Sequence, residues 1–85
     1  MAHDEQQIAL NTGVELLEWC KTESEAELIA SGKAAYNWTA RHLERGNTLV
    51  VEGSWRVDGV RHAVVCRVAR GALPQHATVS VTAEP

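Results

Sequence analysis

Cysteine, histidine, serine and carboxylate side chains are all present in this chain of 85 residues, but none of their spacings is typical of a metal or redox site. Cys20 and Cys66 lie far apart and form no Cys-x-x-Cys motif. A lone pair of this kind, in a chain that we expect to be cytoplasmic, is weak evidence for a disulfide, so we expect two small, buried thiols. The histidines stand singly, without the close spacing of a helical zinc site, at His3, His42, His62 and His76.

No local arrangement of residues activates a nucleophile either. Cys20 lies between Trp19 and Lys21 and is the one thiol whose reactivity is worth testing, although its helical position favours burial. The sequence therefore predicts a protein that is not an enzyme and that holds no metal and no cofactor.

Charge is distributed unevenly along the chain. The formal net charge is −3. Residues 1–30 contain an excess of carboxylates, with Lys21 as their single base, whereas residues 31–85 contain more bases than acids. A locally basic second half favours an anionic partner, and the alternative is a set of solvated faces with no such role.

The length fits one domain. We expect this domain to be of α+β class, with two to three N-terminal helices followed by a three-stranded antiparallel sheet. We expect a tail over residues 1–7, helices over 8–45, the sheet over 48–82 and a short tail over 83–85. No apolar run is as long as a membrane-spanning helix, and the acidic amino terminus lacks the features of a secretory signal. A cytoplasmic protein with no membrane partner is therefore expected.

Capping motifs place the helices. A first helix is expected from about Gln7 to Lys21, with the Thr12-x-x-Glu15 box as an alternative start. The box Thr22-x-x-Glu25 predicts a second helix that ends near Ala30. The first helix has apolar residues over more than half of its circumference, which favours a homodimer through that helix. A later start would narrow this apolar surface.

A third helix is expected from about Lys33 to Arg45, because Gly46 is a good stop signal. At 100° per residue, one face of it carries Tyr36, Thr39, Ala40 and Leu43. Trp38, Arg41 and Arg45 then point outward, beside Asn37. The alternative rotation turns Ala35, Trp38 and His42 inward.

The second half predicts a hairpin around Asp58-Gly59, a strong two-residue turn signal. Closing the turn on Val57 and Val60 fixes the register. It pairs, on the core face, Trp55 with His62, Gly53 with Val64, Val51 with Cys66 and Leu49 with Val68. The other face carries Arg56 opposite Arg61, a positive spot at the tip. A further strand is expected from His76 to Thr82, with Ala77, Val79 and Val81 inward.

Short helices followed by a hairpin resemble the winged helix-turn-helix family. The resemblance covers residues 8–69 and rests on Glu25-Ala26-Glu27-Leu28-Ile29-Ala30, Gly32, Trp38-Thr39-Ala40-Arg41-His42-Leu43-Glu44-Arg45-Gly46 and the Asp58-Gly59 turn. It implies that the third helix is a recognition helix and that the hairpin is a wing. The chain departs from the family in its helix-to-turn spacing and in its additional strand.

The resemblance implies a transcription regulator that binds double-stranded DNA. The alternative is a small module or inhibitor that binds an acidic protein surface through Trp38, Arg41 and Arg45. The overall negative charge favours this alternative. In either case the candidate binding residues are Lys33, Asn37, Trp38, Arg41, Arg45, Arg56 and Arg61.

Overall fold

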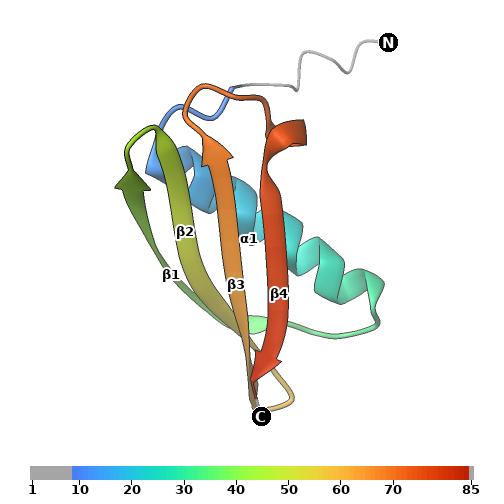
Figure 1. The fold of residues 1–85 in the computed structure, drawn as a ribbon. Coiled ribbons are helices and arrows are strands. Elements are labelled where there is room, and N and C mark those ends of the chain that lie inside the picture. Colours follow the sequence, from blue (N-terminus) through green and yellow to red (C-terminus); the bar gives the residue numbers. More distant parts are fainter. Residues whose placement is uncertain (1–8, 85) are drawn as a thin grey trace, which may run out of the picture.

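The computed structural model describes residues 9–84. The helix α1 (Gly13–Ala30) is followed by β1 (Tyr36–Arg45), β2 (Thr48–Val57), β3 (Val60–Ala69), a 3-10 turn η2 (Pro74–His76) and β4 (Thr78–Glu84). The strands form one antiparallel sheet in the order β1-β2-β3-β4. Figure 1 shows α1 lying diagonally across one face of this sheet, so that the protein has two layers. The other face of the sheet carries no second layer among the described residues.

The amino end of α1 is fixed by a capping box. The Thr12 hydroxyl accepts a hydrogen bond from the Glu15 amide, and the Glu15 carboxylate accepts one from the Thr12 amide. The alternative start at Thr12 is thus confirmed, and residues 9–12 are not helical. The expected tail over residues 1–7 lies outside the described residues.

The prediction of a second helix after Lys21 is wrong, because α1 continues unbroken to Ala30. No glycine or proline separates Lys21 from Glu25, so nothing in the sequence stops the first helix there. Ser24 accordingly lies in the middle of α1, where its hydroxyl donates to the carbonyl of Cys20, one turn earlier.

The prediction of a third helix is also wrong, because residues 36–45 form the edge strand β1. Gly46, interpreted as a helix stop, is the first residue of a two-residue hairpin turn with φ 63°, and Arg45 pairs with Thr48 across it. The α+β class stands, but one helix and four strands replace the expected two to three helices and three strands.

The predicted register of the Asp58-Gly59 hairpin is confirmed. Trp55 lies opposite His62, and Val51 lies opposite Cys66. The further strand is confirmed with shifted bounds, since β4 continues to Glu84 through part of the expected carboxyl tail. Val79 and Val81 of this strand pack against the core as expected.

The core lies between α1 and the sheet. A stripe at intervals of four residues along α1 is buried, and it consists of Leu16, Cys20, Ser24 and Leu28. It faces Leu49, Val51, Trp55, Val64, Cys66 and Val68 of the two central strands.

The prediction of two free thiols is wrong, because Cys20 and Cys66 form a disulfide that joins α1 to β3. The spacing of the cysteines gave no signal of it, since only the packing of α1 on β3 brings them together.

A buried hydrogen bond joins the same two layers. The indole Nε1 of Trp55 donates to the Ser24 hydroxyl over 2.9 Å. Burial of an indole N–H is costly unless it has an acceptor, and Ser24 supplies one. No helix of the described residues is long and apolar enough to cross a membrane.

Candidate binding face

The face of the sheet turned away from α1, here called the open face, is fixed by the strand register. Because side chains alternate along each strand, the residues that flank the buried ones all lie on it. Three cross-strand rows define its centre: Leu43, Val50, Arg67 and Thr78; then Arg41, Glu52, Val65 and Ser80; then Thr39, Ser54, Ala63 and Thr82.

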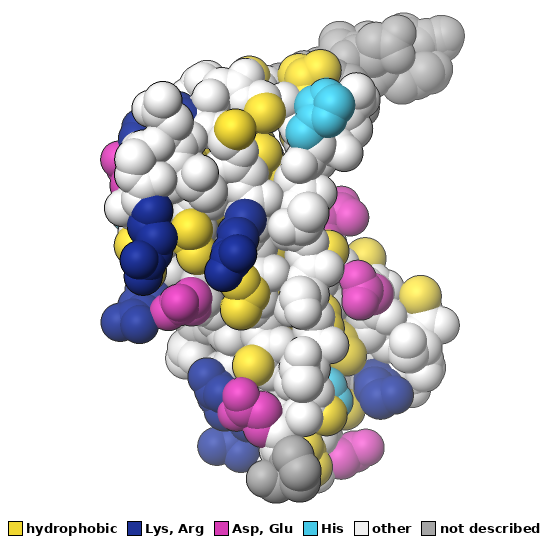
Figure 2. All heavy atoms as spheres, viewed as in Figure 1, with side chains coloured by type: hydrophobic (Ala, Val, Ile, Leu, Met, Phe, Trp, Pro, Cys, Tyr) yellow, Lys and Arg dark blue, Asp and Glu magenta, His cyan; other side chains and the backbone are white. Residues whose placement is uncertain are grey.

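Five arginines from three strands project from the open face. They are Arg41, Arg45, Arg56, Arg61 and Arg67. Against them stand two carboxylates from the strands, Glu52 and Glu84. Figure 2 shows this side of the molecule, where dark-blue side chains lie in groups, with magenta carboxylates beside them, on a surface that is mostly white and yellow.

The arginines differ in their partners. Arg41 forms an ion pair with Glu52 over 2.8 Å, and Arg61 forms one with Glu84. Arg56 donates to the backbone carbonyl of Gly59. Arg45 and Arg67 have no carboxylate within ion-pair distance among residues 9–84. These two side chains therefore keep their charge available to a partner.

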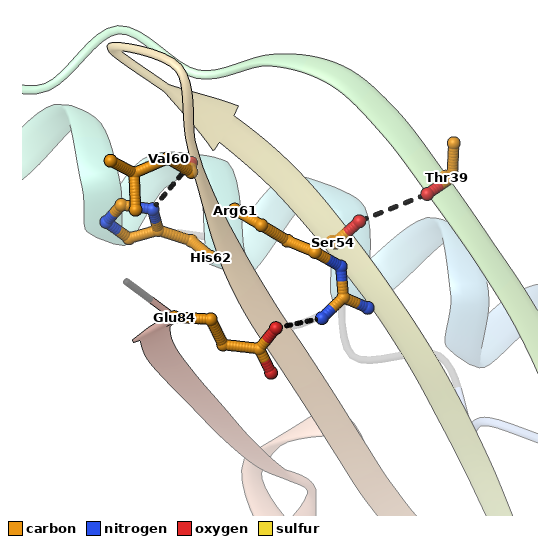
Figure 3. Close-up of polar contacts among 6 residues, drawn as sticks. All are labelled: Thr39, Ser54, Val60, Arg61, His62 and Glu84. Carbon is orange, nitrogen blue, oxygen red and sulfur yellow. Dashed lines mark hydrogen bonds and ion pairs between the residues drawn. The ribbon is translucent and has the colours of Figure 1, made fainter.

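The open face is hollowed between its charged ends. A shallow depression of about 520 Å³ lies over β1, β2 and β3. Small side chains form its floor, including Thr39 and Ser54, whose hydroxyls are hydrogen-bonded over 3.1 Å. The two ion pairs flank this floor, and Figure 3 shows the Arg61 side chain beside Ser54 with Glu84 reaching it from β4.

A second, smaller depression lies at the end of the open face where β1 meets β2. Its volume is about 330 Å³, and it lies between Arg45 and Arg67, with Thr48 and Val50 in its lining. Val50 is only 4% exposed although it is on the open face. The two unpaired arginines thus flank a depression that Glu52 also lines, and their guanidinium groups suit a carboxylate or phosphate of a partner.

The two layers carry opposite charge. The strand residues of the open face have an excess of three positive charges, whereas α1 contains five glutamates and one lysine. Since α1 lies on the far side of the sheet, an anionic partner would meet the basic layer without meeting the acidic one. The net charge of the chain does not reveal this separation of charge between the two layers.

The structure separates the residues predicted as a single binding site. Arg41, Arg45, Arg56 and Arg61 share the open face. Lys33 lies in the exposed connection between α1 and β1, and Asn37 has φ 57° at an irregularity of β1.

Trp38 lies on the opposite side of the sheet from these arginines. Its ring packs against Trp55 at 4.9 Å between centroids, and it contributes to the core. The expectation that Trp38 stands outward beside Arg41 and Arg45 is therefore wrong. Neighbouring residues of a strand point to opposite faces, whereas the helical spacing assumed for this segment placed the three together.

Arg67 was missed as a candidate. The hairpin register already placed it on the same face as Arg56 and Arg61, so the signal was present in the sequence. Arg67 lies eight positions after Gly59, whereas the predicted positive spot of the hairpin was limited to Arg56 and Arg61 at its tip.

One further ion pair lies off the open face. The Arg70 guanidinium hydrogen-bonds Glu44 over 2.6 Å and so ties the end of β1 to the segment after β3. The hydrogen bond and charge of Arg70 lower the pKa of the Glu44 carboxyl, and Glu44 in turn raises the pKa of Arg70.

Among residues 9–84, no three histidine, cysteine or carboxylate side chains gather as metal ligands would. Comparison of the chain with protein-family models, with curated proteins and with solved structures finds no match. The family resemblance inferred from the sequence therefore stays a prediction, and the function is argued from the open face alone.

Proposed function

We propose that this protein is a non-enzymatic binding module that holds an acidic protein partner against its open face. The observation that carries the proposal is the set of five arginines on one uncovered sheet face, opposite an acidic helix. Arg45 and Arg67 are the expected anchors, because neither has to give up an ion pair to bind a carboxylate.

The width of the face favours a protein over duplex DNA. Four strands at a spacing of roughly 4.8 Å span about 15 Å, which exceeds the roughly 12 Å width of the DNA major groove. The third helix, which the predicted winged helix-turn-helix would use as its recognition helix, is replaced by β1. The hollow over the sheet instead suits an extended or helical segment of a partner laid across small side chains.

Double-stranded DNA is the second candidate, as the target of a regulator that uses the hairpin of β2 and β3. A two-stranded ribbon is narrow enough for a groove, and Arg56 and Arg61 are exposed near its tip. Asp58 and Glu84 lie beside them, however, and offset their charge. This local balance makes DNA the weaker proposal.

A binding measurement tests both proposals. Fluorescent poly-L-glutamate and a labelled DNA duplex are each titrated with the protein at low salt. We expect poly-L-glutamate to bind more tightly, and the double variant Arg45→Ala/Arg67→Ala to weaken it roughly tenfold, since each exposed charge contact contributes about 0.2–1 kcal/mol. Arg45→Ala and Arg67→Ala are also measured singly, and Arg70→Ala is the control for each, because it removes one positive charge outside the open face.

Two results would contradict the proposal. If neither polyanion binds at low salt, the open face has no electrostatic role in recognition. If the duplex binds more tightly and Arg56→Ala or Arg61→Ala reduces that binding more than the Arg45→Ala/Arg67→Ala variant, the DNA-binding candidate replaces it.

A cytoplasmic location stays a prediction, and the disulfide weighs against it. Disulfides persist mainly in oxidising compartments, whereas cytoplasmic thiols are usually kept reduced. Acid quenching of intact cells, followed by alkylation in denaturant and mass measurement, distinguishes the two cases, because both cysteines are fully buried in the fold. Modification of both Cys20 and Cys66 supports the cytoplasm, and an unmodified pair supports an oxidising compartment.

A homodimer through α1 also stays a prediction, with less support than the sequence suggested. Leu16, Cys20 and Leu28 are buried against the sheet of the same chain. Val14 and Ile29 are strongly exposed, but they lie near opposite ends of α1, about 22 Å apart at 1.5 Å per residue. They cannot form one continuous apolar patch.

A further inference from the structure

The outer edge of β4 presents unpaired backbone groups. Asp58 and Gly59 both have positive φ, as in a type I′ turn, so the closing pair of Val57 and Val60 exchanges hydrogen bonds. Alternation along β3 then directs the backbone groups of every second residue, including Val65, toward β4.

The same alternation settles the backbone directions in β4. Val65 pairs with Ser80, so the backbone groups of Ser80 point toward β3. Those of Val79, Val81 and Ala83 point away from the sheet, and no other described strand pairs with this edge. Each of these residues thus offers an N–H and a C=O group to an added strand.

This edge lacks the features that usually prevent pairing. Residues 78–83 contain no charged side chain and no proline, and β4 pairs with β3 without a register shift. The other edge of the sheet is interrupted, because β1 has a register shift after Tyr36 and a positive φ at Asn37. A regular and uncharged edge is a surface for strand addition.

The helix continues beneath this edge and past it. Figure 1 shows the carboxyl end of α1 extending beyond β4, behind the plane of the sheet. At 100° per residue, the Glu27 side chain points between the directions of Leu16 and Cys20, which are fully buried, and yet Glu27 is exposed. The sheet therefore no longer covers α1 at this position, and a strand added to β4 would lie over it.

Glu23 lies one turn before Glu27, on the flank of α1 that faces β4. Cys20 is bonded to β3, whereas Ser24, farther along α1, reaches back to β2. The Ser24 side of the buried stripe is therefore directed toward β2, and the opposite side, which carries Glu23, is directed toward β4. Neither glutamate has an ion-pair partner among residues 9–84.

We propose that the β4 edge binds an extended, basic segment of a partner protein, which pairs antiparallel with β4 as a fifth strand. Partner residues opposite Val79, Val81 and Ala83 exchange backbone hydrogen bonds with them, and their side chains lie on the α1 side. Lysine or arginine at these alternate positions meets Glu23 and Glu27. The antiparallel direction continues the pattern of the sheet.

A lone strand fits this edge, and a second copy of the whole fold does not. α1 already occupies the layer behind the added strand, so the partner segment brings no helix of its own to that side. An acidic segment is repelled by Glu23 and Glu27. The open face is a separate surface, because its arginines project from the opposite side of the sheet.

A short blocked peptide, Thr-Lys-Thr-Val-Thr-Lys-Thr, tests the proposal by NMR titration. At about 0.15 M salt, charges more than roughly 8 Å from the bound peptide are screened. We expect the largest amide shifts at Val79, Val81 and Ala83, whose N–H groups gain acceptors. The same peptide with glutamate in place of both lysines should bind at least roughly fivefold more weakly.

Backbone methylation of the peptide distinguishes strand addition from charge attraction. N-methyl groups on the valine and both lysines block the amides that point toward β4, so they should abolish binding. N-methyl groups on three of the threonines lie on amides that point to solvent and should be tolerated. The two methylated peptides have the same charge, so only strand pairing separates them.

Two double variants of the protein locate the charge. Glu23→Gln/Glu27→Gln should weaken binding of the lysine peptide roughly fivefold. Glu18→Gln/Glu25→Gln is the matched control on the side of α1 turned away from the sheet, and it should have little effect. Absence of shifts at the β4 amides, equal binding of the two methylated peptides, or equal effects of the two double variants would overturn the proposal.

Discussion

At the scale of single residues, Ser24 is one of the few polar side chains in the core, and its hydroxyl is fully hydrogen-bonded. Its hydroxyl donates to Cys20 and accepts from the indole of Trp55. No buried side-chain nitrogen or oxygen of the described residues lacks a hydrogen-bond partner. Each member of such a small network is costly to remove, because the group that remains has no access to water.

Ser24→Ala is expected to lower the free energy of unfolding by about 1–3 kcal/mol, since the Trp55 N–H then stays buried without an acceptor. Urea denaturation followed by tryptophan fluorescence measures this change. Ser31→Ala is the matched control, because Ser31 is exposed and its hydroxyl bonds only the Glu27 carbonyl. Equal effects of the two substitutions would show that the bond to Trp55 contributes nothing specific.

At the scale of elements, the contrast between the two hairpins explains what the sequence could predict. Asp58-Gly59 allows essentially one turn type and lies between two alternating runs, so the register of β2 and β3 followed by counting. Gly46-Asn47 is an equally good turn, but the preceding ten residues have apolar positions that also fit a helical stripe. When a short segment fits both periodicities, its neighbours in the fold decide whether it forms a helix or a strand. Here residues 36–45 form a strand because they pair with β2.

The candidate site was therefore predicted in part. Arg56 and Arg61 were placed on one face by the hairpin, and that placement is confirmed. Arg41 and Arg45 were predicted to share a face because residues four positions apart lie on the same side of a helix. They also share the open face of the sheet, because residues an even number of positions apart lie on the same side of a strand. Trp38 is an odd number of positions from Arg41, which is why the same reasoning failed for it.

The ion pair between Glu44 and Arg70 predicts a pH dependence at the end of β1. The pKa of Glu44 lies below its ordinary value of 4.5 because of Arg70. A lowered pKa in the folded state contributes stability that is fully present above pH 4.5 and is lost as the pH falls through the lowered value.

Glu44→Gln should therefore be less stable than the wild type at neutral pH, with the difference disappearing in acid. Thermal unfolding midpoints across this pH range measure it, and the effect is small because the pair is exposed. A difference that persists unchanged in acid would mean that Glu44 acts through packing and not through its charge.

At the scale of the whole molecule, the disulfide and the charge separation follow from the same two-layer arrangement. One layer is an acidic helix and the other a sheet with a basic outer face, and Cys20 and Cys66 join them covalently. In a domain of this size the hydrophobic core is small, so a covalent link between its layers contributes a large share of the stability.

Reduction of the disulfide should lower the free energy of unfolding by about 4 kcal/mol, the chain-entropy value for a loop of 46 residues. Denaturation with and without reductant measures it. The variant Cys20→Ala/Cys66→Ala is the control and should not respond to reductant. Identical midpoints for the oxidised and reduced wild type would show that non-covalent packing alone holds α1 on the sheet.

The most direct test of the central claim is a map of where an acidic chain touches the protein. Backbone and arginine NMR resonances are followed while poly-L-glutamate is added at low salt. We predict shifts concentrated at Arg45, Val50 and Arg67 and extending over the open face, with little change on the exposed side of α1. Shifts confined to α1 or to the Asp58-Gly59 turn, or no shifts at all, would contradict the assignment of the open face as the binding surface.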